Sequence, residues 1–327
     1  MKVLVTGGAG YIGAHVVRLL LERGDEVLVV DDLSTGRADR IGPAALLELD
    51  LASAGAEHTL TERLRTGGVD AVVHLAARKQ VGASVQRPAW YYQQNVGGLA
   101  NVVAAAEAAG VDRFVFSSSA AVYGAVTGGP ASEDGPTAPI SPYGQTKLAG
   151  EWLVRDAEVA WGLRQVSLRY FNVAGAGWPD LGDPAVLNLV TIVLDRWRRG
   201  EPAVVFGTDY PTPDGSAIRD YVHVADLAEA HLVALDYLDR DDRPFDTFNV
   251  GTGAGTSVLA MLAALVAAAA RPGEITLGAR RAGDPVAIVA DPARARRVLD
   301  WSARRGVAEI ADSAWAADAV GRTGAPS

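Results

Sequence analysis

The first 31 residues constrain the fold most, because they are typical of a strand, a glycine-rich turn, a helix and a second strand. A buried strand is predicted for the apolar, β-branched run 2–6, and a helix for the periodic apolar residues that end at Gly24. Gly7, Gly10 and Gly13 lie between the two. The first glycine permits a tight turn, the second lets backbone approach a pyrophosphate, and the third lets the helix pack closely on the strand. This order predicts a dinucleotide site at the start of the helix.

An acidic residue ends the second predicted strand. Asp31 follows Gly13 by 18 residues, which is the spacing of a carboxylate that binds the ribose diol of an adenosine. Because such a carboxylate repels a 2′-phosphate, NAD is favoured over NADP. Other predicted cofactor-binding residues in this half of the chain are Tyr11, Ile12, Asp32, Asp50, Leu51, Leu75, Ala76 and Ala77.

Strands and helices alternate through the first half of the chain. Further strands are predicted at 26–30, 46–49, 70–75, 113–116 and 165–169, and one long helix is predicted from Pro88 to Ala109. This alternation predicts the α/β class, with a doubly wound parallel Rossmann sheet that binds ligands at the carboxyl ends of its strands.

The residue composition changes after residue 172, and this change predicts two domains. The segments 175–184 and 210–215 are rich in turn residues. We therefore expect an NAD-binding domain at 1–172 and a smaller α/β substrate-binding lobe at 173–327. The segment 221–250 is expected to return to the large domain.

Composition argues against several classes of function. The chain of 327 residues has no cysteine, so disulfides, thiolate catalysis and cysteine-bound zinc are excluded. Five histidines without an HExxH spacing argue against a zinc hydrolase, and we expect no metal site. The net charge of −9, with no basic tract, argues against nucleic acid or an anionic membrane as a partner. No apolar run reaches the ~18 residues of a membrane span, and no signal peptide is evident, so we expect a cytoplasmic location.

Tyr143 and Lys147 are the candidate catalytic pair. They stand four residues apart, so on a helix they would share one face, with Cβ atoms about 6 Å apart. An ammonium beside a phenol lowers a phenol pKa that is normally ~10, which makes a base for an alcohol proton. A solvated tyrosine and a surface lysine are the alternative for this pair taken alone. Ser119, at the end of the strand predicted at 113–116, completes a Ser–Tyr–Lys constellation.

The whole set of motifs resembles the short-chain dehydrogenase/reductase superfamily, in its extended NAD-dependent epimerase/dehydratase branch. The resemblance covers nearly the whole chain, and its motifs are VTGGAGYIG (5–13), HLAARKQVGAS (74–84), FSSSAAVYG (116–124), SPYGQTK (141–147), LRYFNVAGA (168–176), IRDYVHVADLAEAH (218–231), FNVGTG (248–253) and RRAGDP (280–285). It implies inversion at C4 of a UDP-hexose, most closely the interconversion of UDP-glucose and UDP-galactose.

The resemblance also implies roles for the catalytic residues. Tyr143 would take the proton of the sugar 4-hydroxyl, Ser119 would bridge the two groups, and Lys147 would bind the nicotinamide ribose. The C4 hydride would pass to NAD. The bound 4-keto sugar would then rotate and take the hydride back from NADH on its other face. Configuration would invert with no net redox change, so NAD would act as a prosthetic group.

Further residues are assigned by the same resemblance. Those expected to bind the cofactor are Lys79, Asn95, Ser117 and Phe171. Those expected to bind the UDP-sugar, together with Ser119 and Tyr143, are Asn172, Asn188, Leu189, Arg219, Arg281 and Asp284. An Arg219–Asp220 ion pair and a helix-surface position for Asn188 are the structural alternatives. A homodimer through the helices at 88–109 and 143–161 is also implied.

Two departures from the branch bear on the reaction. Ala120 and Ala121 stand where the dehydratases of this branch carry an Asp–Glu pair, which argues against dehydration. Ile288 stands where other 4-epimerases carry Tyr or Cys, so we expect UDP-glucose to be preferred, with weak turnover of UDP-N-acetylglucosamine. Epimerisation of an N-acetylated, uronic or pentose sugar is an alternative. Another is an NAD-binding regulator without turnover, although such proteins typically lose the Tyr or the Lys.

Overall fold

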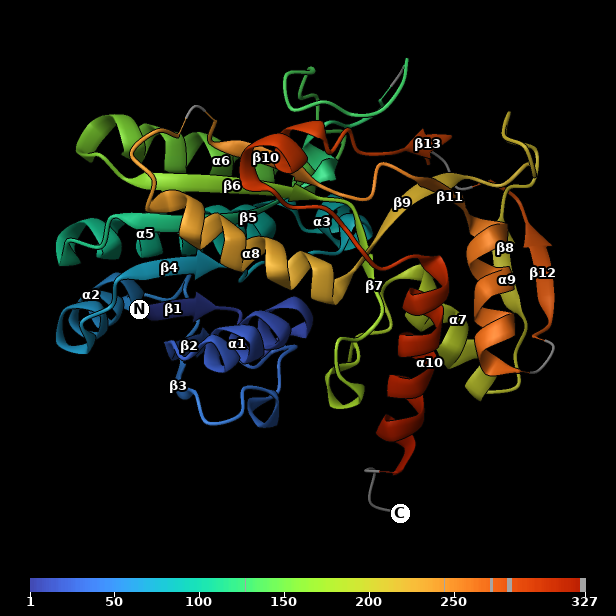
Figure 1. The fold of residues 1–327 in the computed structure, drawn as a ribbon, viewed down its shortest axis with the longest axis horizontal. Coiled ribbons are helices and arrows are strands. Elements are labelled where there is room, and N and C mark those ends of the chain that lie inside the picture. The colour runs from blue at the N-terminus through green and yellow to red at the C-terminus, as the bar shows by residue number, and fades with distance from the viewer. Residues whose placement is uncertain (127, 244, 271–272, 281–283, 324–327) are drawn as a thin grey trace.

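A parallel sheet organises the molecule (Figure 1). The computed structural model describes residues 1–126, 128–243, 245–270, 273–280 and 284–323. Within these residues, seven strands form one sheet in the order β10-β6-β5-β4-β1-β2-β3. The strands are β1 (Lys2–Thr6), β2 (Glu26–Asp31), β3 (Ala45–Glu48), β4 (Ala71–His74), β5 (Arg113–Ser119), β6 (Arg164–Tyr170) and β10 (Thr247–Val250). The predicted doubly wound α/β class is confirmed.

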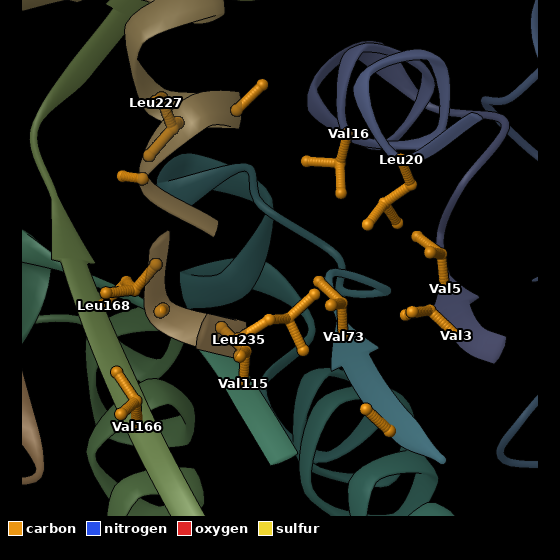
Figure 2. Packing of buried hydrophobic residues seen from close by; sticks show 14 of the residues in the cluster. Val3, Val5, Val16, Leu20, Val73, Val115, Val166, Leu168, Leu227 and Leu235 are labelled. Carbon is orange, nitrogen blue, oxygen red and sulfur yellow. The ribbon is translucent and has the colours of Figure 1, made fainter. Parts of the chain in front are cut away.

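Helices cover both faces of this sheet. Val3 and Val5 of β1 point to one face and pack with α1 (Tyr11–Arg23) and α8 (Val224–Leu238) (Figure 2). Leu4 points to the other face, because successive strand residues alternate. The helices on that face are α2 (Ala56–Gly67), α5 (Gly98–Ala109) and α6 (Pro142–Trp161). Burial on both sides explains why the strands are apolar at almost every position.

The helix predicted from Pro88 to Ala109 is interrupted in its first half. It begins as α4 (Pro88–Tyr92), widens into the π-helical turn η2 (Gln93–Gly97) and continues as α5. A short helix, α3 (Val81–Gln86), precedes it. Such wide turns inside helices are frequently found at functional sites, and η2 carries the buried Asn95.

A smaller lobe lies beyond the carboxyl ends of the strands (Figure 1). In the described part of the chain, one of its sheets contains β7 (Asn172–Ala174), β9 (Ile218–His223), β11 (Gly255–Ser257) and β13 (Ala287–Ile288), and another pairs β8 (Ala203–Phe206) with β12 (Ile275–Gly278). Its helices are α7 (Leu189–Arg198), α9 (Val258–Ala269) and α10 (Val307–Thr323).

The chain crosses between the two parts more than once. β9 pairs with strands of the lobe, whereas α8 and β10, which follow it, pack on and join the central sheet. Short turns complete the connections: η1 (Ala38–Arg40), η3 (Ala120–Val122), η4 (Pro179–Leu181) and η5 (Ala295–Leu299). Among the described helices, none combines the length and the apolar character needed to span a membrane.

Candidate active site

The glycine turn after β1 is closely packed against neighbouring backbone. A Cβ at Gly7 would lie 2.7 Å from the backbone nitrogen of Ala76, and one at Gly13 would lie 2.1 Å from the Gly7 carbonyl oxygen. The turn therefore requires glycine at both positions, and it places the start of α1 beside the end of β4. The strand order reverses between β1 and β4, which is where doubly wound sheets bind dinucleotides.

Asp31 is a buried acid held in one orientation at the end of β2. One carboxylate oxygen accepts the Ala9 N–H at 3.0 Å, and the other accepts the Leu33 N–H at 2.9 Å. Burial raises the pKa of Asp31, and these two hydrogen bonds partly oppose that rise. Each oxygen keeps a lone pair for a further donor. The closely packed turn and this oriented carboxylate together fit a dinucleotide with a free ribose diol, so the residues present fit NAD.

The other predicted cofactor residues lie around the same strand ends, with different surroundings. Ile12 is half-buried against the core, and Leu51 is buried in it. Asp50 accepts the Ala52 N–H at 2.9 Å and stays exposed. Leu75, Ala76 and Ala77 are half-buried after β4. Their contacts with a cofactor remain predictions.

Tyr11 and Lys79 contact the smaller lobe directly. The Tyr11 hydroxyl donates to the Gly175 carbonyl at 2.6 Å, and the Lys79 ammonium lies 4.0 Å from the Asp183 carboxylate. A cavity of about 830 Å³ is lined by Tyr11, Gly175, Asp183 and Asn188, among other residues. This volume is in the range of small-molecule sites, ~300–1,000 Å³. Ser119, Tyr143 and Lys147 do not line this cavity, so it lies to one side of the predicted catalytic residues.

The predicted catalytic residues meet at the end of β5 and the start of α6. Ser141 caps this helix by accepting the Gly144 N–H at 3.2 Å, and Pro142 occupies its first position. The cap fixes Tyr143 in the first turn. The Ser119 side chain accepts the Ala121 N–H at 3.2 Å, and its interaction with the Tyr143 phenol lowers the pKa of that phenol in part. Lys147 follows one turn later on the same helix, and the catalytic roles of Ser119, Tyr143 and Lys147 remain predictions.

The pKa of the Tyr143 phenol departs from the sequence-based expectation. Burial raises this pKa, and the Ser119 hydrogen bond lowers it only in part. The expected effect of Lys147 on the phenol is therefore corrected: its ammonium donates to the Ser117 carbonyl at 2.8 Å instead. The lysine pKa is itself lowered to about 8, because burial outweighs the attraction of Glu151.

A buried ion pair lies one helical turn after Lys147, where Glu151 of α6 meets Arg169 of β6. The Arg169 guanidinium binds the Glu151 carboxylate, with Nη2 to Oε2 at 2.6 Å, and the two side chains are 5% and 1% exposed. Ser118 donates to the same carboxylate at 2.5 Å. Sequence reasoning missed Glu151, although it stands four residues after Lys147 and so faces the same side of α6.

Ser117 and Asn95 are engaged with the protein itself. The Ser117 side chain is fully buried and lies 3.1 Å from the His231 ring. The Asn95 amide accepts the Arg78 N–H at 2.8 Å and donates to the Thr146 hydroxyl at 3.0 Å. Asn95 therefore joins the loop after β4 to α6. Direct contact of either residue with a cofactor remains a prediction.

The predicted substrate residues are spread over the lobe. The Arg219 guanidinium pairs with Asp284 at 2.6 Å. Asp220 instead accepts N–H bonds from Thr252, Gly253 and Ala290. The suggested Arg219–Asp220 ion pair is thus wrong, because Asp220 is fully buried among these backbone donors.

Helix capping accounts for Asn188. Its side chain accepts the Thr191 N–H at 3.0 Å and donates to Asp183 at 2.9 Å, so it begins α7 rather than lying on the helix surface. Leu189 follows as the first residue of α7, half-buried against the lobe core. Phe171 is buried and Asn172 exposed at the start of β7, whereas Arg281 lies outside the described residues.

Comparison with known proteins identifies the family. Residues 3–251 match the model of the NAD dependent epimerase/dehydratase family. The chain belongs to the NAD-dependent epimerase/dehydratase family. The UDP-glucose 4-epimerase of Azospirillum brasilense is 45% identical over 306 residues, which cover 92% of this chain and 86% of that protein. The UDP-glucose 4-epimerase of Rhizobium meliloti (strain 1021) is 41% identical over 96% of both chains.

Solved structures of this epimerase family superpose along almost the whole chain. A UDP-glucose-4-epimerase from Stenotrophomonas maltophila with bound NAD and formylated UDP-arabinopyranose has a TM-score of 0.94 at 36% identity, and covers 99% of this chain and 100% of that one. A Bifidobacterium longum UDP-glucose 4-epimerase with NAD+ and UDP has a TM-score of 0.90 at 34% identity, with coverage of 99% and 100%. The large sheet and the smaller lobe are thus both shared with these proteins.

Proposed function

We propose that the protein inverts C4 of a UDP-hexose, interconverting UDP-glucose and UDP-galactose, with NAD as a prosthetic group. The observation that carries this proposal is the placement of Ser119 at the end of β5 together with the buried Tyr143 and Lys147 on α6, in a sheet whose strand β1 ends in a closely packed glycine turn. The relatives that match almost the whole chain are UDP-glucose 4-epimerases.

The chain supplies positioning and proton transfer. The glycine turn, Asp31 and Lys147 would hold NAD, which supplies a reversible acceptor for the C4 hydrogen when bound. The Tyr143 oxygen takes the proton of the sugar 4-hydroxyl, through or beside the Ser119 hydroxyl. The bound 4-keto sugar then rotates so that its opposite face is presented. The same Tyr143 oxygen returns the proton to the sugar O4. A single residue thus acts as base and then as acid.

Charge in the site must favour the phenolate for this transfer. Burial raises the pKa of Tyr143, and Ser119 is the side chain that opposes this rise. The nearby Lys147 ammonium is held 2.8 Å from the Ser117 carbonyl. We infer that Lys147 would hold the cofactor ribose and supply positive charge to this part of the site.

Turnover without added cofactor tests this function. The purified protein is incubated with UDP-galactose and no external NAD, and the appearance of UDP-glucose is followed. We expect conversion to an equilibrium mixture by protein that contains bound NAD. Absence of conversion, even after NAD is added, would contradict the proposal.

The same assay ranks the substrates. Ile288 is half-buried on β13, packed against a cluster that contains Phe171, Ala120 and Tyr123. Because Ile288 packs on this cluster, whose Ala120 follows Ser119 in the chain, we expect UDP-glucose to be used better than UDP-N-acetylglucosamine. Equal or better kcat/KM for the acetylated sugar would reverse that ranking.

We also propose that the protein is a homodimer through the helices expected at 88–109 and 143–161, of which α4 and α6 pack beside one another and beside α3. Apolar side chains are exposed on these helices: Val85 at 63%, Trp152 at 55% and Val159 at 84%. A second copy would cover them. Light scattering should give the mass of two chains for the natural protein and of one chain for Trp152→Glu. A monomeric natural protein would contradict this proposal.

The cytoplasmic location also stays a prediction, which cell fractionation would test.

A further inference from the structure

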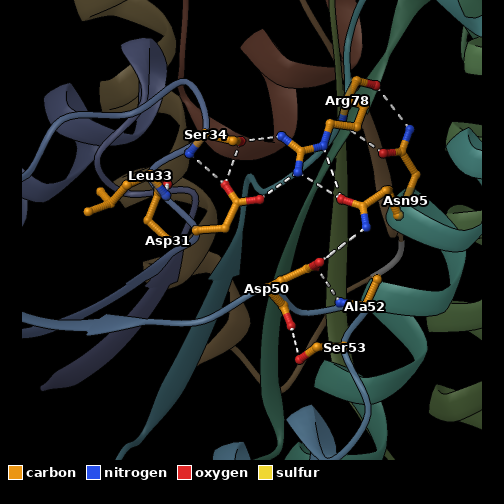
Figure 3. A network of polar contacts seen from close by, with 10 residues as sticks. Asp31, Leu33, Ser34, Asp50, Ala52, Ser53, Arg78 and Asn95 are labelled. Atoms are coloured by element: carbon orange, nitrogen blue, oxygen red, sulfur yellow. Dashed lines mark hydrogen bonds and ion pairs between the residues drawn. The ribbon is translucent and has the colours of Figure 1, made fainter.

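Arg78, in the loop after β4, joins groups from separate parts of the predicted adenosine site (Figure 3). Its guanidinium pairs with the Asp32 carboxylate, 2.5 Å from Nη2 to Oδ2, and donates to the Ser34 hydroxyl. It also donates twice to the side-chain amide oxygen of Gln94, at 3.0 and 2.8 Å. Three partners therefore engage one planar cation, an arrangement that the fixed geometry of Arg suits and that of Lys does not.

The chain of contacts continues to the next strand. The Gln94 amide nitrogen lies 3.4 Å from both oxygens of Asp50. The residues Asp32, Arg78, Gln94 and Asp50 thus run from the end of β2 to the end of β3. Asp31, predicted to bind the ribose, precedes Asp32 at one end of this run, and Asp50, also a predicted cofactor residue, lies at the other end.

The backbone of Arg78 is held in place by hydrogen bonds to the Asn95 side chain. Its N–H donates to the Asn95 amide oxygen at 2.8 Å, and its carbonyl accepts from the Asn95 amide nitrogen at 3.0 Å. The guanidinium also lies over the Trp90 ring, 5.2 Å from its centroid. Because the side chain is held on several sides, little further ordering is needed to keep it there.

The Arg78 cation reduces the repulsion between two adjacent carboxylates. Asp31 and Asp32 repel one another, and Arg78 opposes that repulsion at both carboxylates. With Asp32 paired, the carboxylate of Asp31 is free to accept from a ribose diol. The ion pair is only partly exposed, since the Arg78 and Asp32 side chains are 20% and 26% accessible.

We propose that Arg78 is a positioning residue that straps the adenosine half of bound NAD, through its contacts with Asp32, Ser34 and Gln94, and so keeps the cofactor on the protein between turnovers. The inference rests on the proposed function, since it takes NAD as the ligand. It assigns a role to a residue outside the Ser–Tyr–Lys set and the glycine turn.

The test measures loss of NAD rather than turnover. Holoenzyme is diluted into NAD-free buffer, and bound NAD is determined after gel filtration at successive times. We expect Arg78→Leu to lose NAD at least about 10-fold faster, equal to about 1.4 kcal/mol. Arg87→Leu is the matched control, because Arg87 also lies over Trp90, at 4.2 Å, without joining the strap.

A double-mutant comparison and the salt dependence of NAD loss distinguish a specific role of Arg78 from a general loss of structure. Asp32→Asn should accelerate NAD loss in the natural background and add little in Arg78→Leu, because both changes remove one ion pair. Raising the salt concentration should accelerate loss from the natural protein more than from Arg78→Leu. Arg78→Gln serves in place of Arg78→Leu if the latter does not fold.

Equal rates of NAD loss from Arg78→Leu, Arg87→Leu and the natural protein would overturn the strap. Slower loss from Arg78→Leu would also overturn it, because Arg78 would then compete with the cofactor. Natural protein that neither retains nor binds NAD would overturn the proposed function and the strap together.

Discussion

At the scale of single residues, the site depends on buried charges held by specific partners. Lys147 is buried, yet its pKa falls only to about 8, because Glu151 opposes the effect of burial. Glu151 in turn is held by Arg169 and Ser118. The lysine charge that the mechanism uses near neutral pH therefore depends on a carboxylate one helical turn away.

Replacing Glu151 by Gln should shift the pH dependence of turnover. Loss of the carboxylate charge lowers the pKa of Lys147 below about 8, so the alkaline limb of kcat should move to lower pH. The unpaired Arg169 should also destabilise the fold, by about 3–5 kcal/mol. The pH profile of kcat and urea unfolding measure the two effects.

Glu158→Gln is the control for this change, since Glu158 lies on the same helix and accepts from Gln165 at 3.0 Å. An alkaline limb that stays in place in Glu151→Gln would show that Glu151 does not act on Lys147.

At the scale of elements, the glycine turn is the most demanding part of the chain. Gly13→Ala should destabilise the protein by about 1–3 kcal/mol or more, because the new methyl group would meet the Gly7 carbonyl at 2.1 Å. It should also abolish NAD retention. Gly82→Ala is the matched control: no atom outside the immediate chain lies within 4 Å of its added Cβ, and the residue is in a helix. Thermal unfolding and bound NAD should separate the two variants.

Elements with strong local signals could be predicted from the sequence. The glycine turn, Asp31 at the end of β2, and Tyr143 with Lys147 on α6 all follow from spacing and strand ends, since parallel strands end on one edge. The π-turn η2 was not predicted, because nothing in the periodicity of 88–109 marks one extra residue per turn. The partners of Arg78, Arg219 and Arg169 come from distant segments, so no local pattern indicates them.

At the scale of the whole molecule, buried histidines link stability to pH. Burial lowers the pKa of His74 to about 3 and those of His15, His223 and His231 to about 4. The unfolded chain binds protons at these residues near pH 6.5, before the folded chain does. The stability they contribute is therefore present above about pH 6.5 and is lost as the pH falls toward 4.

Thermal unfolding between pH 7.5 and 5 should show this loss as a falling Tm. His231→Gln should flatten the dependence by removing one fully buried group. His58→Gln should leave it unchanged, because His58 is exposed. A Tm that stays constant from pH 7.5 to 5 would contradict the linkage.

The direct test of the catalytic account is the Tyr143→Phe variant, assayed for conversion of UDP-galactose and for bound NAD on the same sample. Removing the hydroxyl leaves the buried ring in place and takes away the atom that accepts the sugar proton. We predict that kcat falls by about 10²–10⁴ while bound NAD per chain is unchanged. Turnover at the natural rate by this variant would show that another group takes the proton, and would contradict the account.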